Sequence, residues 1–395
     1  MHIALITDGI SPYVTGGMQR HSYHLARNFL AQGVKLTLVH AIEHDSEIPS
    51  EKEVKALLNA PKGMLRIIGL NFPKSMKVPG HYLRESYKYS QSVYESLKDE
   101  WANFDFIYAK GFSAWALIEK KKKGQHMAPV GVKFHGYEMF QKAPNLKSRI
   151  EQFMLRPPVV FNSRNANVVF SYGGEITEII KKMGVPESRI VEIGSGVDNA
   201  WIVDKPKEEG EKRKFLFVGR AERRKGISEL MHSVKVLDAS QAEMHWVGPA
   251  FEKKKGTNSL NFFHGEISDS EALKVIFDQC QVLITPSHSE GMPNVILEAM
   301  ARGLAVISTR VGAIPEMISD KNGRLIKPGS EKELRRAIKE MAALSKSELM
   351  ELRKESLKVV SEKFSWNSVA TQTLNAIRRI TYSSKKQEVD SQIKP

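Results

Sequence analysis

The stretch EGMPNVILEA, at residues 290–299, holds two carboxylates eight positions apart around an apolar run. Pro293 suits the first position of a helix, because its missing N–H group would have no intrahelical partner there. A helix that begins at Pro293 leaves Glu290 in the preceding loop and puts Glu298 about a turn and a half inside the helix. From these places both carboxylates could accept hydrogen bonds from the hydroxyl groups of a ligand.

The start of the same helix would also attract negative charge. The backbone N–H groups of Asn294 and Val295 would point out of its first turn, and unpaired groups of this kind bind anions. The loop FVGRAERRKG, at residues 217–226, adds Arg220 at the end of a predicted strand and Lys225 at the start of a helix. Arginine offers a planar fork to phosphate oxygens and lysine a mobile point charge. Together these groups predict a site for a nucleotide sugar, with the diphosphate on the cations and hydroxyl groups on the carboxylates.

Each of these features also has a plain structural explanation. Two glutamates at this spacing arise by chance in a chain with 45 acidic residues. A basic loop is often a solvated surface segment, and we expect this of Arg223 and Arg224. The order strand, loop, helix, strand across residues 281–310 favours function, because it puts both carboxylates at the carboxyl edge of a parallel sheet near the cations.

Two weaker candidates lie earlier in the chain. Gly16 and Gly17, in SPYVTGGMQRH, follow the first predicted strand and would let the backbone approach a phosphate closely. They form no G-x-G-x-x-G fingerprint, and a simple strand-to-helix turn is the alternative. His135, in VKFHGYE, is predicted at the end of a strand and therefore at a ligand-binding edge. A hydrogen-bonded structural histidine is the alternative there.

The elements that must position these residues alternate between short β-rich runs and helical stretches. The pattern predicts strands at 2–7, 34–42, 65–70, 104–111, 130–136, 167–172, 190–194, 215–220, 244–249, 260–265, 281–287, 305–310 and 323–329. The clearest helix lies at 18–33, with Leu25, Phe29 and Leu30 on one face and Gly33 as its stop. This alternation predicts an α/β fold of parallel sheets covered by helices on both faces.

The length of 395 residues exceeds that of one ordinary core, and the pattern restarts after the polar stretch at 204–214. We therefore predict two Rossmann-like domains, at residues 1–200 and 201–363, joined near 195–212. Ligands of such sheets bind beyond the carboxyl ends of the strands, so a deep cleft between the two domains is the expected site. A last helix at 364–380 carries an apolar stripe of Trp366, Val369, Leu374 and Ile377.

The composition is that of a globular protein with excess positive charge. Hydrophobic residues make up 41% and charged residues 26%, and the net charge of +14 is spread over both halves of the chain. Nucleic acid, an anionic membrane surface and a phosphorylated small substrate all fit this charge, but no nucleic-acid-binding motif is present. No signal peptide or membrane-spanning stretch is readable, and Cys280 is the only cysteine, so a cytoplasmic protein is expected.

In order along the chain, these motifs resemble those of the retaining glycosyltransferases of family 4, which have the GT-B fold. The resemblance covers residues 1–380 and rests on the Gly-Gly loop, HGYE, IGSGVD, GRAERRKG and EGMPNVILEAMARGLAVIST. One departure is Ser195, which stands where the family more often has asparagine before Gly-Val-Asp.

The resemblance implies roles for the residues of the second domain. Arg220 and Lys225 would neutralise the donor diphosphate, Glu298 would bind the ribose, and Glu290 with the backbone after it would hold hydroxyl groups of the donor sugar. The implied catalytic residues are His135, Arg220, Lys225 and Glu290. The implied donor-binding residues are Gly16, Gly17, Arg220, Lys225, Glu290, Gly291, Met292, Pro293, Asn294, Val295 and Glu298.

The first domain would supply the acceptor side and part of the donor site. The resemblance implies that Gly17 approaches the phosphate and that His135 lies against the donor sugar near the reacting carbon. It also implies that the helix at 364–380 crosses back to pack on the first domain.

The implied activity is retaining transfer of a sugar from a UDP- or GDP-sugar to a hydroxyl group of a glycan or lipid-linked acceptor, in the synthesis of cell-surface polysaccharide, lipopolysaccharide or glycolipid. Fixed cations and a helix dipole would stabilise the leaving diphosphate. No D-x-D motif occurs, so no metal or other cofactor is expected to be required. Front-face attack is favoured over a covalent intermediate, because no second carboxylate is placed as an obvious nucleophile.

Two other functions compete with this one. A nucleotide-sugar epimerase of the GT-B type would share the architecture, and a non-catalytic binding protein could use a transferase scaffold. The transferase motifs are present in order, which favours a glycosyltransferase over both of these alternatives. The sequence does not distinguish the donor base, the acceptor or the oligomeric state.

The last sequence feature concerns membranes. The segment at 140–158 repeats Leu146, Ile150, Phe153 and Met154 at helical spacing, and Lys142, Lys147, Arg149 and Arg156 surround this stripe. Such a helix either packs on its own domain or lies reversibly on the anionic inner face of the cell membrane, where a lipid-linked acceptor would be presented. The basic segment at 72–86, which carries Tyr82, could line the acceptor side.

Overall fold

The computed structural model describes residues 1–14, 16–42, 49–76, 78, 80–141, 146–220, 222–249 and 260–393, with the side chains of 146–148 and 383–393 outside the description. The chain forms two compact units. The first comprises Met1–Tyr172, Ile176–Ile193 and Trp366–Pro395, and the second Gly173–Glu175 and Gly194–Ser365. The main change from one unit to the other falls at Ile193 and Gly194, just ahead of the junction predicted near 195–212.

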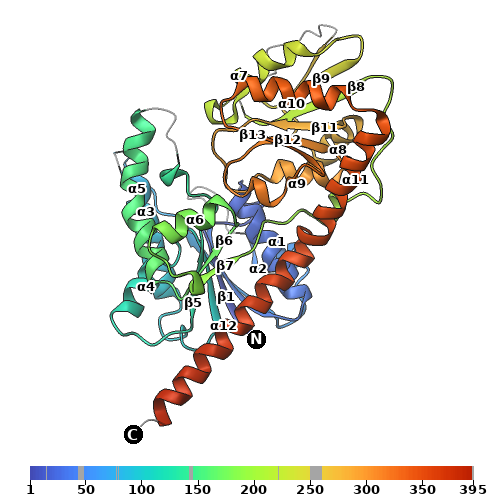
Figure 1. The fold of residues 1–395 in the computed structure, drawn as a ribbon. Helices are drawn as coiled ribbons and strands as arrows, with labels where there is room; N and C mark the ends of the chain where they lie inside the picture. Colours follow the sequence, from blue (N-terminus) through green and yellow to red (C-terminus); the bar gives the residue numbers. More distant parts are fainter. Residues whose placement is uncertain are drawn as a thin grey trace. The chain divides into compact units, whose positions relative to one another are not determined.

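The first unit is built on a parallel sheet, whose seven described strands run in the order β3-β2-β1-β4-β5-β6-β7 (Figure 1). The strands are β1 (His2–Thr7), β2 (Lys35–Ile42), β3 (Leu65–Asn71), β4 (Phe106–Lys110), β5 (Val130–Lys133), β6 (Val168–Ser171) and β7 (Ile190–Glu192). The helices are α1 (Gly17–Ala31), α2 (Glu51–Leu57), α3 (His81–Ser96), α4 (Trp115–Lys122), α5 (Leu146–Asn165), α6 (Glu175–Lys182) and α12 (Trp366–Ile393).

Helices cover both faces of this sheet. Successive residues of a strand point to opposite faces, so each strand packs against helices on both sides. In β1, Ile3 and Leu5 pack in one buried cluster with side chains of α1, α2 and α12, while Ala4 and Ile6 pack in another with side chains of α3 to α6. A strand buried on both faces must be apolar throughout, which explains the continuous apolar run in HIALIT.

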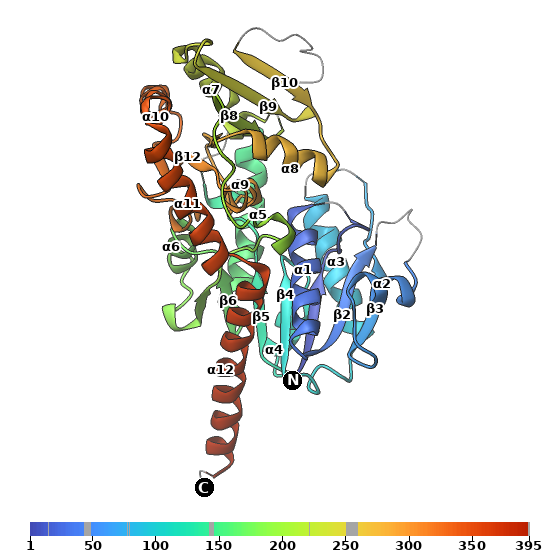
Figure 2. The same cartoon turned by 90° about the vertical axis from the view of Figure 1, so that its right-hand side faces the viewer.

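The C-terminal helix belongs to the first unit, as the family resemblance implied. Trp366, Val369, Leu374 and Ile377 of α12 are buried in the same cluster as Leu25 of α1, and Figure 2 shows α12 running alongside this part of the sheet. The helix begins two residues later than predicted and continues to Ile393. Its apolar stripe is therefore part of the core of the first unit.

The second unit repeats the plan with six described parallel strands in the order β10-β9-β8-β11-β12-β13. They are β8 (Arg213–Val218), β9 (Ala242–Val247), β10 (Asn261–Gly265), β11 (Val282–Thr285), β12 (Ala305–Thr309) and β13 (Gly323–Ile326). The helices are α7 (Ile227–Ser233), α8 (Ser270–Gln279), α9 (Asn294–Ala301), α10 (Glu331–Ala343) and α11 (Lys346–Lys363). Side chains of α7 and α10 pack on one face of the sheet, and α8 and α9 lie on the other (Figure 1).

Short 3-10 helices complete the described part of the chain: η1 (Glu138–Phe140), η2 (Glu187–Arg189), η3 (Asn199–Trp201), η4 (Arg223–Lys225), η5 (Val234–Val236) and η7 (Ile314–Glu316). No helix among the described residues is both long enough and apolar enough to cross a bilayer.

Every predicted strand is present, and the differences lie at the strand ends. The strand predicted at 130–136 stops at Lys133, because pairing with β4 ends at the Lys110–Lys133 pair. The strand predicted at 215–220 runs instead from Arg213 to Val218. His135 and Arg220 therefore lie in loops just beyond their strands rather than at the strand ends. These loops follow the carboxyl ends of parallel strands, where α/β proteins bind ligands.

Candidate functional site

The loop after β8 is held against the loop after β11 by a glycine. Gly226 separates η4 from α7 with a φ of +69°, and a Cβ atom there would lie 2.1 Å from the carbonyl oxygen of Pro286. Only glycine tolerates both this conformation and this approach. Lys225 was predicted at the start of the helix, but it is the last residue of η4 and α7 begins after Gly226. The close approach carries Lys225 to the residues that follow β11.

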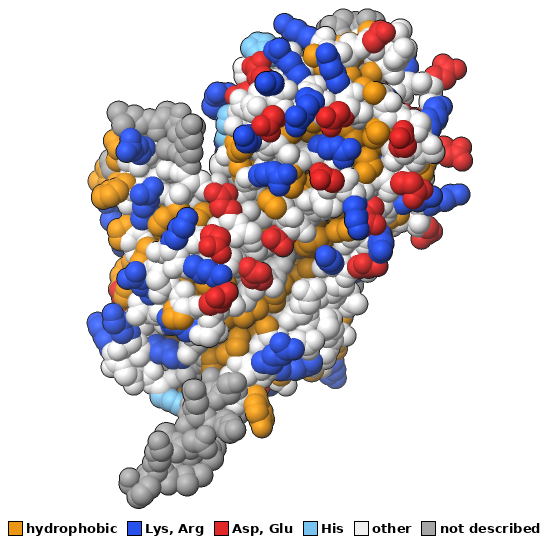
Figure 3. Space-filling view, viewed as in Figure 1, with side chains coloured by type: hydrophobic (Ala, Val, Ile, Leu, Met, Phe, Trp, Pro, Cys, Tyr) orange, Lys and Arg blue, Asp and Glu red, His pale blue; other side chains and the backbone are white. Residues whose placement is uncertain are grey.

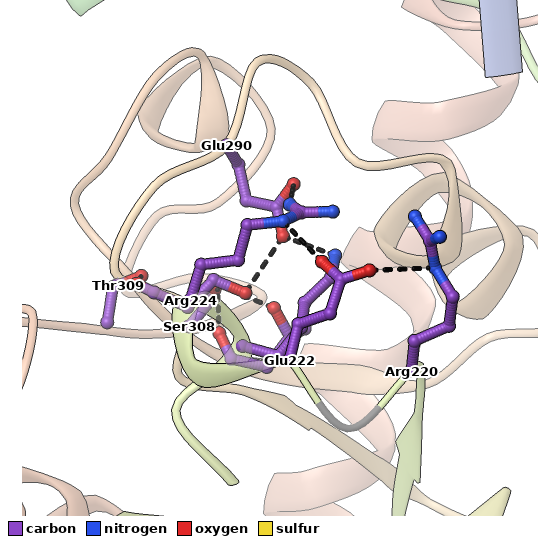
Figure 4. A network of polar contacts seen from close by, with 9 residues as sticks. Arg220, Glu222, Arg224, Glu290, Ser308 and Thr309 are labelled. Carbon is purple, nitrogen blue, oxygen red and sulfur yellow. Dashed lines mark hydrogen bonds and ion pairs between the residues drawn. The ribbon is translucent and has the colours of Figure 1, made fainter. Parts of the chain in front are cut away.

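Lys225 and Glu290 form the centre of a polar cluster in the second unit, and Figure 4 shows the Glu290 carboxylate among its partners. The Lys225 ammonium donates to Glu290 Oε1 at 2.5 Å, and the Ser287 hydroxyl donates to the same oxygen at 2.9 Å. The side chain of Glu290 is only 9% exposed and that of Lys225 17%. A buried carboxylate is stable only with partners of this kind. The two residues were expected to contact different parts of a donor, and here they also contact each other.

Arg224 and Glu222 extend this cluster, and the sequence reasoning missed them. Arg224 Nε lies 2.6 Å from Glu222 Oε2, and Arg224 also reaches Glu290 Oε2 at 3.5 Å. Glu222 in turn pairs through its other oxygen with Arg220 Nε at 3.0 Å (Figure 4). The expectation that Arg224 is a solvated loop residue was wrong, because its side chain is 31% exposed and paired with carboxylates. Glu222, two positions ahead in the sequence, was the available signal.

Arg220 differs from Arg224 and Lys225 in its exposure. Its side chain is 71% exposed while that of Lys225 is 17% exposed. An exposed ion pair such as Arg220–Glu222 contributes little to stability, so the guanidinium can exchange this partner for a ligand at low cost. Arg220 is therefore the cation of this loop best placed to meet an incoming anion.

A second ion-pair group, Arg223, Glu229 and His288, braces the loop from the side of α7. Arg223 donates to both carboxylate oxygens of Glu229, at 2.7 and 2.9 Å, and His288 Nε2 lies 3.0 Å from Oε1. Burial raises the pKa of the Glu229 carboxyl, but its own backbone N–H, Arg223 and His288 outweigh this and hold the pKa below its usual value. Arg223 is exposed, as expected, but it is paired with this carboxylate.

The predicted helix after Glu290 is α9, and it begins at Asn294 rather than Pro293. Pro293 is the capping residue, with an extended backbone at φ −73° and ψ 122°. Glu298 lies inside the helix as predicted and is 8% exposed. Val295 lies in the first turn of α9, where the backbone N–H groups and the helix dipole favour an anion.

The loop between Glu290 and α9 is fixed by contacts of its own. Ala313 donates its N–H to the Gly291 carbonyl at 2.8 Å, and Ser195 donates its N–H to the sulfur of Met292 at 3.0 Å. The Ser195 hydroxyl also lies 3.4 Å from Asn294 Oδ1. Ser195, the residue that departs from the family pattern, therefore positions the segment that leads into α9.

The remaining predicted residues belong to the first unit. Gly17 is the first residue of α1 and Gly16 precedes it as the capping residue with a φ of +157°. His135 lies in a buried cluster, with Nδ1 2.6 Å from the Tyr172 hydroxyl and Nε2 3.5 Å from Lys110 Nζ. Burial first, and then the two neighbouring lysines, hold the pKa of His135 well below its usual value, so the ring is neutral.

The sequence reasoning missed the residues that surround His135. Lys110 Nζ lies 2.6 Å from Nδ1 of His21, and the His21 ring meets that of His135 edge-on at 4.9 Å. Lys133 donates to the Ile193 carbonyl at 2.7 Å and lies 4.2 Å from the centre of the Tyr172 ring. Burial lowers the pKa of Lys133 to about 7, and that of Lys110 well below its usual value. Each lysine is a charged residue at the end of an otherwise apolar strand, and this departure from the apolar pattern could have identified both from the sequence.

The predicted residues thus form two groups, each with its own geometry. Gly16, Gly17 and His135 belong to the first unit, and the residues from Arg220 to Glu298 belong to the second. Within the part of the chain that the structure describes, no group of three or more histidine, cysteine or acidic side chains is arranged to hold a metal ion.

Comparison with known proteins identifies the family. Residues 15–201 match Glycosyltransferase Family 4, and residues 212–343 match Glycosyl transferases group 1. The chain belongs to the family-4 glycosyltransferases with the GT-B fold. The putative teichuronic acid biosynthesis glycosyltransferase TuaC of Bacillus subtilis is 31% identical over 44% of this chain and 46% of its own length. The match therefore spans less than half of that relative.

Two solved structures share the fold of this glycosyltransferase. Sucrose-phosphate synthase from Thermosynechococcus elongatus matches with a TM-score of 0.74 and 19% identity, over 97% of this chain and 99% of that one. HepE from Anabaena, in complex with UDP, matches with a TM-score of 0.68 and 15% identity, over 96% and 100% of the two chains. At these identities the likeness shows the GT-B fold, and the chain is related to glycosyltransferases of cell-surface polysaccharide synthesis such as TuaC.

Proposed function

We propose that this protein is a retaining glycosyltransferase that moves a sugar from a nucleotide-diphosphate sugar to a hydroxyl group of a glycan or lipid-linked acceptor. The observation that carries the proposal is the buried Glu290 carboxylate, held at 2.5 Å by Lys225 beside the mouth of α9. A basic loop that is only a solvated surface segment does not require its lysine to be held by a buried carboxylate. A donor site needs that lysine fixed where the diphosphate leaves.

In this mechanism the second unit stabilises the leaving group. Arg220 exchanges its exposed partner Glu222 for a phosphate oxygen, and Lys225, held by Glu290, presents a fixed ammonium. Such preorganised charges lower the barrier because they need no rearrangement as the leaving charge develops. Glu298 holds the ribose hydroxyl groups, and the first turn of α9 faces the phosphates.

The donor is proposed to be a UDP-sugar, because HepE, which shares the fold, was solved with UDP. A thermal-shift series with UDP, GDP and their common sugars tests this, since a ligand that binds only the folded state raises the unfolding temperature. A rise with UDP-sugars alone supports the proposal, and a rise with GDP-sugars alone replaces the base. Activity should persist in the presence of a chelator of divalent ions, because the cations of the second unit neutralise the leaving diphosphate in place of a metal ion.

The epimerase and binding-only alternatives predict different products. A retaining transferase releases UDP and forms a new glycoside with the anomeric configuration of the donor, which proton NMR reads directly. An epimerase converts one nucleotide sugar into another without any acceptor. A binding-only protein leaves the donor unchanged beyond the background rate.

We further propose that the first unit docks on the anionic inner face of the cell membrane through an apolar patch, composed of Met76, Val78, Tyr82, Ile150 and Phe153. All five side chains are exposed, Met76 at 83% and Phe153 at 70%. Figure 3 shows apolar side chains over α5 at the edge of the first unit. The two parts of the patch adjoin, since a Cβ atom on Gly80 would lie 3.0 Å from Met154 Cε.

The exposure of this patch supports the membrane explanation of the segment at 140–158. Ile150 is 58% exposed and Phe153 70% exposed, so neither side chain is buried in its own domain, and exposed Lys74, Arg84 and Arg149 lie in the same two segments. Arg156 is instead held inward by the Met139 carbonyl. Lys142 and the side chains of Leu146 and Lys147 lie outside the described residues. A basic surface around apolar side chains is the composition that anionic bilayers attract.

Vesicle co-sedimentation tests the docking. The protein should pellet with vesicles of anionic lipid at low salt and less at physiological salt, and should ignore neutral vesicles. The double variant Ile150→Ser, Phe153→Ser should stay in solution, while Val275→Ser, an equally drastic change at an exposed residue of the second unit, should pellet like the parent. Equal pelleting of the parent with neutral and anionic vesicles, or none with either, contradicts the proposal.

A further inference from the structure

Charged side chains of alternating sign form a ladder beyond the carboxyl ends of β8 and β11. The ladder runs from Arg220 through Glu222, Arg224 and Glu290 to Lys225, and Figure 4 shows its first four members. Arg220 lies at the solvent end, whereas Glu290 and Lys225 form the buried end. Its three positive and two negative groups leave an excess of one positive charge. The ladder is therefore nearly neutral, although most of its members are cations.

Glu222 is the carboxylate that two arginines of this ladder share. Its Oε1 lies 3.0 Å from Nε of Arg220, and its Oε2 lies 2.6 Å from Nε of Arg224. The backbone of the turn is held separately, because the Glu222 N–H donates to the Arg220 carbonyl at 2.8 Å and the Lys225 N–H donates to the Glu222 carbonyl at 2.9 Å. The Glu222 carboxylate can therefore change partners while the backbone of the turn stays in place.

The two contacts of Glu222 are unequal. Arg224 is closer to the carboxylate, and its side chain is 31% exposed while that of Arg220 is 71% exposed. Solvent screens the pair with Arg220 more strongly, so this is the pair that separates at lower cost. After the separation Glu222 still has a cationic partner in Arg224. A diphosphate that approaches Arg220 thus meets a carboxylate that is already there and can withdraw.

We propose that Glu222 is an internal competitor of the donor diphosphate. Its carboxylate neutralises Arg220 in the empty site, withdraws to Arg224 when the diphosphate binds, and returns to Arg220 as UDP leaves. Glu222 acts through Arg220 and is therefore a positioning residue. The proposal rests on the glycosyltransferase function proposed above and adds a limit on how tightly the donor site holds a nucleotide. Such a limit favours turnover, because equally tight binding of donor and product lowers KM without accelerating the reaction.

Calorimetric titration of the full-length protein with UDP tests the proposal. Glu222→Gln keeps the shape of the side chain and removes its charge, so the Kd of UDP should fall by about 3- to 10-fold. Most of this change should appear as slower dissociation of UDP in stopped-flow displacement. Glu222→Asp keeps the charge and should bind UDP like the parent. The gain of Glu222→Gln should shrink at high salt, because the ion pair with Arg220 is exposed.

A matched control separates this local effect from a change in net charge. Glu211 is exposed and precedes β8, at the opposite end of that strand from Arg220. Glu211→Gln changes the net charge of the protein by the same amount and should bind UDP like the parent. Damage to the fold would weaken binding, so the expected increase in affinity also distinguishes the proposal from a purely structural role of Glu222.

A second background tests Arg224 as the partner to which Glu222 withdraws. In Arg224→Gln the Glu222 carboxylate loses this partner and stays on Arg220, so UDP should bind more weakly than to the parent. Adding Glu222→Gln should then tighten UDP binding by a larger factor than it does in the parent. Equal factors in the two backgrounds would overturn the role of Arg224.

The other outcomes distinguish the internal competitor from the function on which it rests. Weaker UDP binding in Glu222→Gln would mean that Glu222 holds Arg220 ready for the phosphate, and unchanged binding that the ion pair is only a solvated contact. Either result overturns the competitor and leaves the transferase intact. Inorganic pyrophosphate is the second probe. If Glu222→Gln tightens its binding in a protein that binds neither UDP nor GDP, the nucleotide-sugar donor is overturned and the competitor is retained.

Discussion

Both units place cations at or just beyond the carboxyl ends of parallel strands, but the surroundings of these cations have opposite effects on their charge. In the second unit Arg220, Arg224 and Lys225 are each paired with Glu222 or Glu290. In the first unit Lys110 and Lys133 are fully buried and contact imidazoles, a carbonyl and aromatic rings. Carboxylate partners keep a cation charged, whereas burial without them favours the neutral form.

This difference indicates different tasks. Fixed positive charge suits the stabilisation of a leaving diphosphate, because the charge must be present before the bond breaks. A buried group whose pKa is near neutrality, such as Lys133, changes its charge in response to pH or to a bound anion. The first unit is therefore expected to be the pH-sensitive half of the protein.

The largest effect is expected from a truncation that disrupts the first unit and leaves the second intact. Truncation before residue 364 removes α12 and with it Trp366, whose ring meets His21 edge-on at 4.8 Å and stacks on His24 at 5.1 Å. Because this exposes the apolar side chains of α1, insoluble or inactive protein is expected, measured by soluble yield and sugar transfer. Truncation after residue 382 should leave both unchanged, and a soluble, fully active product of the first truncation would refute the role of α12.

The next effect concerns the fixed charges of the second unit. Lys225→Ala and Arg220→Ala should each lower turnover by about 100-fold or more, since each removes positive charge from the leaving group. Steady-state release of UDP measures this. Lys235→Ala, at an exposed lysine of the same unit, is the control and should be fully active. Near-normal turnover in both site variants would contradict the assignment of these two residues to the donor site.

A smaller effect separates the two glutamates. Glu298→Gln should weaken UDP binding by about 10-fold, as loss of hydrogen bonds to a carboxylate does, with less effect on turnover at saturation. Glu290→Gln should mainly lower turnover, because Lys225 loses its anchor. Calorimetry with UDP and kinetics at saturating donor measure the two effects, with Glu266→Gln as an exposed control. If UDP binds Glu298→Gln as tightly as the parent, the ribose role is withdrawn.

The smallest effect tests whether Lys133 of the first unit is neutral, in contrast to the charged cations of the second unit. Because burial depresses the pKa of Lys133 from 10.5 to about 7, the unfolded chain binds more protons than the folded one between these values, and stability rises with pH there. The free energy of unfolding of the parent, relative to Lys133→Met, should therefore increase by at most about 1.4 kcal/mol per pH unit from pH 7 to 10. Denaturant unfolding at several pH values measures it. A difference independent of pH would mean that Lys133 is charged in the fold.

Much of the architecture was predictable because it follows from local patterns. Apolar runs of the β-rich type are separated by amphipathic helices, and each run became a strand of a parallel sheet. The ends of the strands were not predictable, since pairing stops where the neighbouring strand stops, as at Lys110 and Lys133. For the same reason the sequence placed His135 and Arg220 on strands rather than in the loops that follow them.

The sequence by itself determined the fold class, the place of Glu290 ahead of α9 and that of Glu298 within it, and the candidate cations, because all of these depend on neighbours within a few residues. Only the tertiary structure decided which groups meet. The strand order β1-β4-β5 brings Asp8, Lys110 and Lys133 together from positions up to 125 residues apart. Glycine at 226 lets the loop of Lys225 close on that of Glu290. Burial and pairing, which set the charge of each group, exist only once those distant segments have packed.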